Sequence, residues 1–83
     1  MSNNRHNSVD SMIGNYTESL RRSRKLSQHQ LADILLIDRQ EIEKIERGTY
    51  PLSVSNLYKI CEIFETSIND FYTNALSKDI DIE

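Results

Sequence analysis

Two helix-start signatures separated by a very short joint constrain the fold of this chain more than any other feature. Ser27 is followed three residues later by Gln30, and Asp38 is followed three residues later by Glu41. In such a capping box, the first side chain accepts from a backbone amide of the first helical turn, and the second side chain accepts from the backbone amide of the first residue. Because apolar residues at helical spacing follow each signature, this segment is predicted to form two short helices joined by a tight turn.

Apolar residues recur at helical spacing along most of the chain, at i, i+3, i+4 and i+7. The spacing predicts helices at about 9–24, 28–35, 39–47, 54–64 and 68–76. The expected core residues of the first four are Val9, Met12, Ile13, Tyr16, Leu20, Leu31, Ala32, Ile34, Leu35, Ile42, Ile45, Val54, Leu57, Ile60, Cys61 and Phe64. The chain is therefore predicted to be all-α. One domain at 9–76 is expected, with a flexible arm at 1–8 and an acidic tail at 77–83.

Composition excludes several classes of protein. The chain is 37% hydrophobic and 28% charged, and it contains no apolar run near the roughly 20 residues of a membrane span. A single cysteine, Cys61, provides neither a disulfide nor a zinc framework and fits a reducing cytoplasm. The lone histidines do not indicate metal, and neither a phosphate-binding loop nor a catalytic motif is present. We therefore expect a cytoplasmic protein that is not an enzyme and has no metal, cofactor or membrane partner.

Charge is distributed unevenly along the chain. The formal net charge is −3, yet "RRSRK" places four positive residues together at the end of the first predicted helix. On a helical wheel of the third helix, Glu46 falls on the buried side with Ile42 and Ile45 and therefore needs a partner. Glu43 falls on the outer side with positive and amide residues, and two arginines lie four residues before and after it.

The run "LSQHQLADILLIDRQEIEKIERG" resembles the helix-turn-helix of the phage-repressor-like family, the Xre and Cro/C1 type regulators. The resemblance continues upstream through "IG" and "LRRSRK" and downstream through "NLYKICEIF" and "TSINDFY", and it covers residues 12–72. It implies a compact five-helix lambda-repressor-like DNA-binding domain, with the helix-turn-helix at the second and third helices. It also implies a homodimer that binds double-stranded DNA at a pseudo-palindromic operator.

The resemblance also implies roles for single residues. Gln28 corresponds to a glutamine that contacts the DNA backbone and supports the recognition helix, and Arg21 with Glu46 corresponds to a structural ion pair. The resemblance implies DNA contact by Gln28, Arg39, Gln40, Glu43, Lys44, Thr49 and Tyr50. The outer face of the helical wheel adds Arg47, and the basic cluster adds Arg22 and Lys25 as candidate phosphate contacts. An ion pair of Glu43 with an arginine is as consistent with the sequence as cytosine readout, and Arg22 and Lys25 could instead only cap the helix. The last helix is expected to supply a dimer interface through Ile68, Phe71, Tyr72 and Leu76.

Three positions depart from the family pattern, which usually has glycine where this chain has Lys25, Leu36 and Glu65. Leu36 lies at the turn of the motif. Either it adopts a left-handed conformation, at a cost of about 1–2 kcal/mol, or the turn differs locally. The sequence therefore predicts a DNA-binding transcriptional regulator, acting as a repressor. The alternative is a protein-interaction module, such as an antitoxin or anti-regulator, with the same fold.

Overall fold

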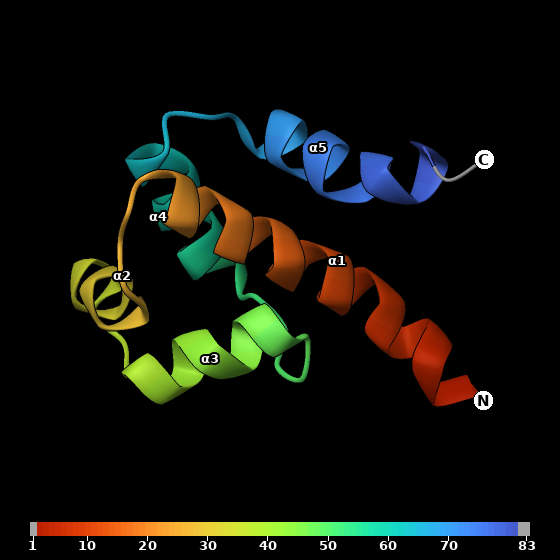
Figure 1. The fold of residues 1–83 in the computed structure, drawn as a ribbon, viewed down its shortest axis with the longest axis horizontal. Coiled ribbons are helices and arrows are strands. Elements are labelled where there is room, and N and C mark those ends of the chain that lie inside the picture. Colours follow the sequence, from red (N-terminus) through yellow and green to blue (C-terminus); the bar gives the residue numbers. More distant parts are fainter. Residues whose placement is uncertain (1, 82–83) are drawn as a thin grey trace.

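The computed structural model describes the backbone of residues 2–81 and the side chains of residues 9–77. This part of the chain is built from helices arranged around α1 (Figure 1). The helices are α1 (Ser2–Ser23), α2 (Gln28–Leu35), α3 (Arg39–Arg47), α4 (Val54–Ile63) and α5 (Ile68–Asp81). The predicted bounds of α2 and α3 are confirmed, whereas α1 begins earlier and α5 ends later than the apolar spacing predicted. The side chains of the expected arm, and of all but the first residue of the expected tail, lie outside the described residues.

Serine side chains begin three of the helices. Ser27 forms the predicted capping box: its hydroxyl accepts from the Gln30 amide at 3.0 Å, and the Gln30 side chain accepts from the Ser27 amide at 2.7 Å. Ser53 and Ser67 each accept from the amide three residues on, at 3.1 and 2.9 Å. Each bond satisfies a backbone donor that the first helical turn leaves without a partner.

The predicted capping box at α3 is wrong. Asp38 has the extended backbone of a capping residue, but its carboxylate accepts no capping bond. Its backbone carbonyl instead accepts from the amides of Glu41 and Ile42, at 2.9 and 3.3 Å. Because Asp38 is exposed, water can solvate both its carboxylate and the first amides of the helix, so a direct bond gains little. The negative charge still lies at the positive end of the α3 dipole.

All three residues that replace the usual glycine adopt the left-handed conformation. The φ angle is 59° at Lys25, 62° at Leu36 and 55° at Glu65. The turn between α2 and α3 therefore keeps its left-handed geometry, and the Leu36 amide donates to the carbonyl of Asp33 at 3.3 Å. Leu36 itself is 83% exposed, so no packing of its side chain offsets the strain of the turn.

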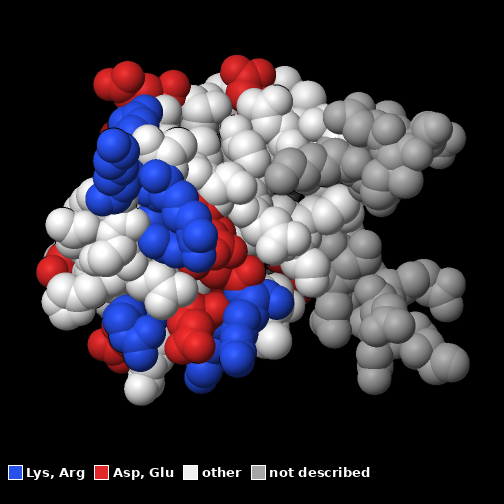
Figure 2. Space-filling view, in the orientation of Figure 1, with Lys and Arg blue, Asp and Glu red and all other residues white. Residues whose placement is uncertain are grey.

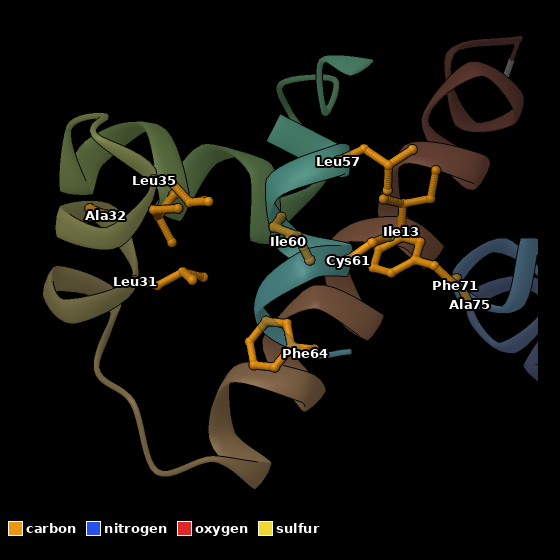
Figure 3. Close-up of a cluster of buried hydrophobic side chains, with 11 residues drawn as sticks. Ile13, Leu31, Ala32, Leu35, Leu57, Ile60, Cys61, Phe64, Phe71 and Ala75 are labelled. Atoms are coloured by element: carbon orange, nitrogen blue, oxygen red, sulfur yellow. The ribbon is translucent and has the colours of Figure 1, made fainter. Parts of the chain in front are cut away.

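The hydrophobic core lies between α1 and the helices on either side of it. In Figure 1, α5 runs along one side of α1 and α3 lies on the other, and α1 contacts both. The buried cluster consists of Ile13, Leu31, Ala32, Leu35, Ile42, Leu57, Ile60, Cys61, Phe64, Phe71 and Ala75. Phe71 extends from α5 towards Ile13 and Cys61 (Figure 3). Its ring also meets Tyr16 edge-on, with a centroid separation of 5.1 Å.

Four predictions about apolar side chains need correction. Phe71 is fully buried within its own chain, so its side chain cannot form part of a dimer interface. Conversely, Val9, Ile34 and Val54 were expected in the core and are exposed. Ile34 lies at an edge of the apolar stripe of α2, and Val54 is the first residue of α4. Val9 lies on the apolar stripe of α1 but precedes the buried Ile13, and spacing alone does not show where along a helix contact with the core ends.

A close crossing of α1 and α3 positions the recognition helix. A Cβ atom added at Gly14 would lie 2.2 Å from the carbonyl oxygen of Ile45. Gly48 ends α3 with a φ of 80°, and a Cβ there would lie 2.6 Å from the hydroxyl of Ser11. Glycine therefore allows α3 to pack directly against the backbone of α1.

Candidate DNA-binding surface

Helix α3 has one face in the core and one face in solvent. Ile42, Ile45 and Glu46 are buried on the inner face. The outer face carries long side chains with nitrogen donors, all of them exposed: Arg39, Gln40, Lys44 and Arg47. The helical wheel predicted this division, and the structure confirms it. Donors of this type, on a helix that projects from a domain, can reach phosphates and base edges in a DNA groove.

The predicted pair between Arg21 and Glu46 is present and bidentate. Arg21 Nε donates to Glu46 Oε2 at 2.7 Å, and Arg21 Nη2 donates to Oε1 at 3.1 Å. Arg21 Nη1 also donates to the carbonyl of Leu26 at 2.8 Å. Both side chains are less than one tenth exposed, and the bond to Glu46 raises the pKa of Arg21. The pair therefore fastens α3 to the end of α1 through a guanidinium that stays charged.

A hydrogen-bonded chain leads from this buried pair to the surface. The Gln28 amide nitrogen donates to Glu46 Oε1 at 3.0 Å. The Gln28 amide oxygen accepts from Arg39 Nη1 at 3.3 Å. The two bonds fix the orientation of the amide and link Glu46 to Arg39. The resemblance implied that Gln28 supports the recognition helix, but the sequence did not predict these two partners, because they depend on how α2 and α3 cross.

Glu43 lies between two arginines on the outer surface of α3. Its carboxylate is 3.7 Å from Arg39 Nη1 and 4.0 Å from Arg47 Nε. All three side chains are between two fifths and seven tenths exposed. The expected ion pairs are therefore present in the free protein. Arg39 and Arg47 lie on the helix surface near a shared carboxylate.

Positive side chains also surround the start of the helix-turn-helix. Figure 2 shows Lys and Arg over the C-terminal half of α1 and again along α3, with carboxylates between them. Arg22 projects from α1 and pairs with Glu18 at 2.8 Å, and its side chain is 70% exposed. Lys25, in the following loop, is also exposed. These two residues lie at the basic end of α1, beside the start of α2, as expected.

The loop after α3 continues the exposed surface. The Thr49 hydroxyl donates to the carbonyl of Lys44 at 3.2 Å and closes the end of the helix, and Tyr50 is exposed. A hollow of ≈ 170 Å³, which the sequence did not predict, lies beside this loop and is lined by Asp38, Gln40, Glu41, Lys44 and Tyr50. The hollow brings two carboxylates next to the donors of α3, so this surface is not uniformly positive.

Other reactive groups give no second site. Cys61 is buried, and burial raises the pKa of its thiol. Among residues 9–77, no group of three His, Cys, Asp or Glu side chains could hold a metal ion. None of the helices in the described part of the chain combines the length and apolar character needed to cross a membrane.

Comparison with known proteins identifies the family. Residues 18–71 match the family model described as helix-turn-helix. This chain belongs to the helix-turn-helix family. Two curated relatives are uncharacterized HTH-type transcriptional regulators of Rickettsia conorii and Rickettsia prowazekii, and each is 34% identical over 64 residues. The match covers 77% of this chain and 51% and 49% of the two relatives, so the chain spans about half their length.

Solved structures confirm the predicted all-α fold. The clp gene regulator ClgR from Corynebacterium glutamicum superimposes with a TM-score of 0.78 at 20% identity, over 84% of this chain and 74% of the other. The restriction-modification controller protein C.AhdI from Aeromonas hydrophila gives 0.71 at 25% identity, over 77% of this chain and 97% of the other. The resemblance inferred from the sequence is thus confirmed at the level of family and fold.

Proposed function

We propose that this helix-turn-helix protein is a sequence-specific transcriptional repressor that binds a pseudo-palindromic operator as a homodimer in the cytoplasm. The observation that supports the proposal best is the construction of α3. One face is fastened to the core by Arg21 and Glu46, and the other presents exposed donors to solvent. A helix that is held rigidly by the core and carries long polar side chains on its exposed face can bind base edges in a DNA groove.

The side chains of α3 divide into base readers and phosphate binders by their chemistry. Gln40 can make a bidentate contact with adenine, and Arg39 or Lys44 can donate to guanine O6 and N7. Arg47 and the residues around the ends of the motif reach outward to phosphates, which set the register of the protein on the duplex. These outer residues are Arg22, Lys25, Gln28, Thr49 and Tyr50. Glu43 pairs with two arginines in the free protein, and its carboxylate can also accept from a cytosine amino group.

An exposed apolar surface on α4 and α5 supports the homodimer. Tyr58 projects from α4, and Ile68 and Tyr72 project from one side of α5, all of them exposed. A hollow of ≈ 300 Å³ lies between the two helices and is lined by Tyr58, Cys61, Glu62, Thr66, Ser67 and Ile68. In a two-fold dimer, an aromatic side chain of one copy can enter the hollow of the other, so the same patch serves both copies.

The charge of the chain also supports a homodimer. A net charge of −3 gives a single domain little non-specific attraction to DNA. Two linked domains add the contacts of two half-sites, about 34–36 Å apart on the duplex. The expected contributors to the interface are now Ile68, Tyr72 and the half-buried Leu76, without Phe71. A second copy is the occupant that matches this two-site requirement.

A selection experiment tests sequence-specific binding. The wild-type protein is used to select duplexes from a random pool, and affinity is then measured for the selected duplex and for a shuffled duplex of the same composition. We expect the selected duplex to bind at least 100-fold more tightly, at the lower end of specific recognition. Gln40→Ala should remove most discrimination at one base position with an unchanged Tm. Asn74→Ala, an exposed amide on α5, should change neither quantity.

Equal binding to both duplexes would refute the proposal and favour the protein-interaction module. Repression is tested separately by placing the selected duplex across a promoter and measuring transcription in vitro; undiminished transcription at full occupancy contradicts it. For the homodimer, Tyr72→Glu should shift the sedimenting species from dimer to monomer, whereas Asn74→Glu should not. A wild-type protein that sediments as a monomer at high micromolar concentration contradicts the dimer.

A further inference from the structure

We propose that Glu43 is a specificity-determining residue that weakens binding to DNA lacking the operator sequence. It does so by holding Arg39 and Arg47 on the surface of α3 and by placing a carboxylate where non-specific phosphates would approach. The inference rests on the proposed function, because it assigns a role within the same DNA-binding surface. It replaces cytosine readout by Glu43 with an indirect role.

Arg39 is restrained by contacts within the protein. Its Nη1 atom lies 3.3 Å from Gln28 Oε1 and 3.7 Å from a carboxylate oxygen of Glu43. One nitrogen of the guanidinium therefore donates a hydrogen bond to Gln28 and forms an ion pair with Glu43. Gln28 is held in turn by Glu46, whose carboxylate is buried. These contacts restrain Arg39 before DNA arrives, and moving it towards an arbitrary phosphate separates it from both partners.

Arg47 also lies close to the carboxylate of Glu43. Its Nε atom lies 4.0 Å from the other carboxylate oxygen of Glu43, and its side chain is 69% exposed. An arginine this exposed can turn towards a phosphate of any sequence. The nearby carboxylate reduces the positive charge that a phosphate meets there, and the like charges of carboxylate and phosphate repel each other. Exposed pairs of this kind are individually weak, but the effect applies to every duplex that contacts the surface.

The repulsion from Glu43 affects binding to the operator and to other DNA differently. On the operator, the ordered Arg39 can make its base contact without first losing side-chain freedom, which offsets the repulsion from Glu43. On other DNA, no base contact compensates for the same repulsion. Among the acids of α3, Glu43 alone lies between two arginines in this part of the chain: Glu46 is buried with Arg21, and Glu41 faces the hollow beside Lys44. The selectivity effect is therefore assigned to Glu43.

The test compares Glu43→Gln with Glu65→Gln. Both changes remove one exposed carboxylate, but Glu65 lies in the loop between α4 and α5. The probes are the duplex selected by the wild-type protein and its shuffled counterpart, each titrated at several NaCl concentrations. We expect Glu43→Gln to bind the shuffled duplex about three- to tenfold more tightly, the size that two exposed pairs imply. Its salt slope should steepen by about 0.9 for each additional phosphate neutralised.

Affinity of Glu43→Gln for the selected duplex should change by less than about twofold, so the specificity ratio falls by nearly the gain on shuffled DNA. Glu65→Gln should leave the ratio unchanged. The inference is overturned if Glu43→Gln binds shuffled DNA like the wild type, or if it loses affinity only for the selected duplex, which would show base readout. A wild type that does not discriminate between the duplexes refutes the proposed function instead, and a circular dichroism spectrum confirms that each variant is folded.

Discussion

Removing the carboxylate of Glu46 should destabilise the whole domain although the residue lies on the recognition helix. Glu46 accepts three hydrogen bonds, two from Arg21 and one from Gln28, at 2.7, 3.1 and 3.0 Å. In Glu46→Ala, the guanidinium stays charged and buried but retains only the Leu26 carbonyl and the more distant carboxylate of Glu18, at 4.0 Å. A buried charge that has lost its main partner is the costly case.

The magnitude follows from the environment of the pair. Breaking a buried ion pair by removing one partner costs about 3–5 kcal/mol. A domain of 83 residues has a total stability of roughly 4–12 kcal/mol. The variant should therefore lose a large part of its stability, which corresponds to a fall in Tm of roughly 12–40 °C. Thermal and urea unfolding, followed by circular dichroism at the helical signal, measure the loss.

A second variant separates the charge from the packing. In Arg21→Met with Glu46→Leu, no buried charge remains, so stability should return to within about 2 kcal/mol of the wild type. Glu18→Ala is the matched control: it removes the other carboxylate near Arg21, which is one third exposed, and should cost less than about 1 kcal/mol. A loss below about 1 kcal/mol in Glu46→Ala, or a double variant less stable than Glu46→Ala, would refute this reasoning.

Three further predictions concern the turn, the helix crossing and the buried thiol. Leu36→Gly should raise the free energy of unfolding by up to about 1 kcal/mol in urea titrations, because it removes left-handed strain from an exposed residue; no gain would contradict the strain. Gly14→Ala should lower Tm strongly, since its Cβ would lie 2.2 Å from a carbonyl oxygen of α3, whereas the exposed Asn15→Ala on the same helix should not. Burial raises the pKa of Cys61, so the thiol stabilises the fold below its unfolded pKa of about 8.5 and loses this contribution as pH rises. Unfolding free energy should then fall more steeply above that pH in the wild type than in Cys61→Ala, and equal slopes would contradict the assignment.

Local signals predicted where α2, α3 and α4 start, but they predicted the capping bond correctly only where the cap is a serine. The hydroxyls of Ser27 and Ser53 accept from the amides of the first turn, as the sequence suggested. Asp38 has the right spacing to Glu41, but its charged side chain is exposed, and water competes well for a carboxylate. The spacing of a motif specifies which bond is possible, and solvation decides whether it forms.

The ends of the first and last helices could not be predicted from apolar spacing, because spacing reports contact with the core and not the path of the backbone. Helix α1 begins before its first core residue, and α5 continues beyond its last core residue. A similar limit explains the misassigned side chains. Phe71 and Tyr72 are adjacent aromatics on α5, yet the first is buried and the second exposed, and only the packing of α5 against α1 separates them.

The sequence predicted which side chains lie on the exposed face of α3, but only some of the hydrogen bonds and ion pairs that they make. The wheel placed Glu46 inside α3, but its partner Arg21 lies 25 residues earlier, so the pairing depended on the resemblance to a known family. The hydrogen bonds that link Glu46 through Gln28 to Arg39 depend on how α2 and α3 cross, and the spacing of residues in the sequence does not specify this crossing. Contacts within one helix, such as those of Glu43 with its arginines four residues away, were accessible from spacing alone.

The net negative charge of the chain is a poor measure of the local charge on the exposed face of α3. Glu46 is enclosed with Arg21, and Glu43 is divided between two arginines, so neither acts as an isolated negative charge. Long-range attraction is still weak, because it depends on the net charge of −3 and not on local pairing. In the proposed homodimer, discrimination would therefore come from short-range contacts made by ordered side chains, with affinity increased by the second copy. Occupancy of the proposed operator would then depend on protein concentration through dimerisation.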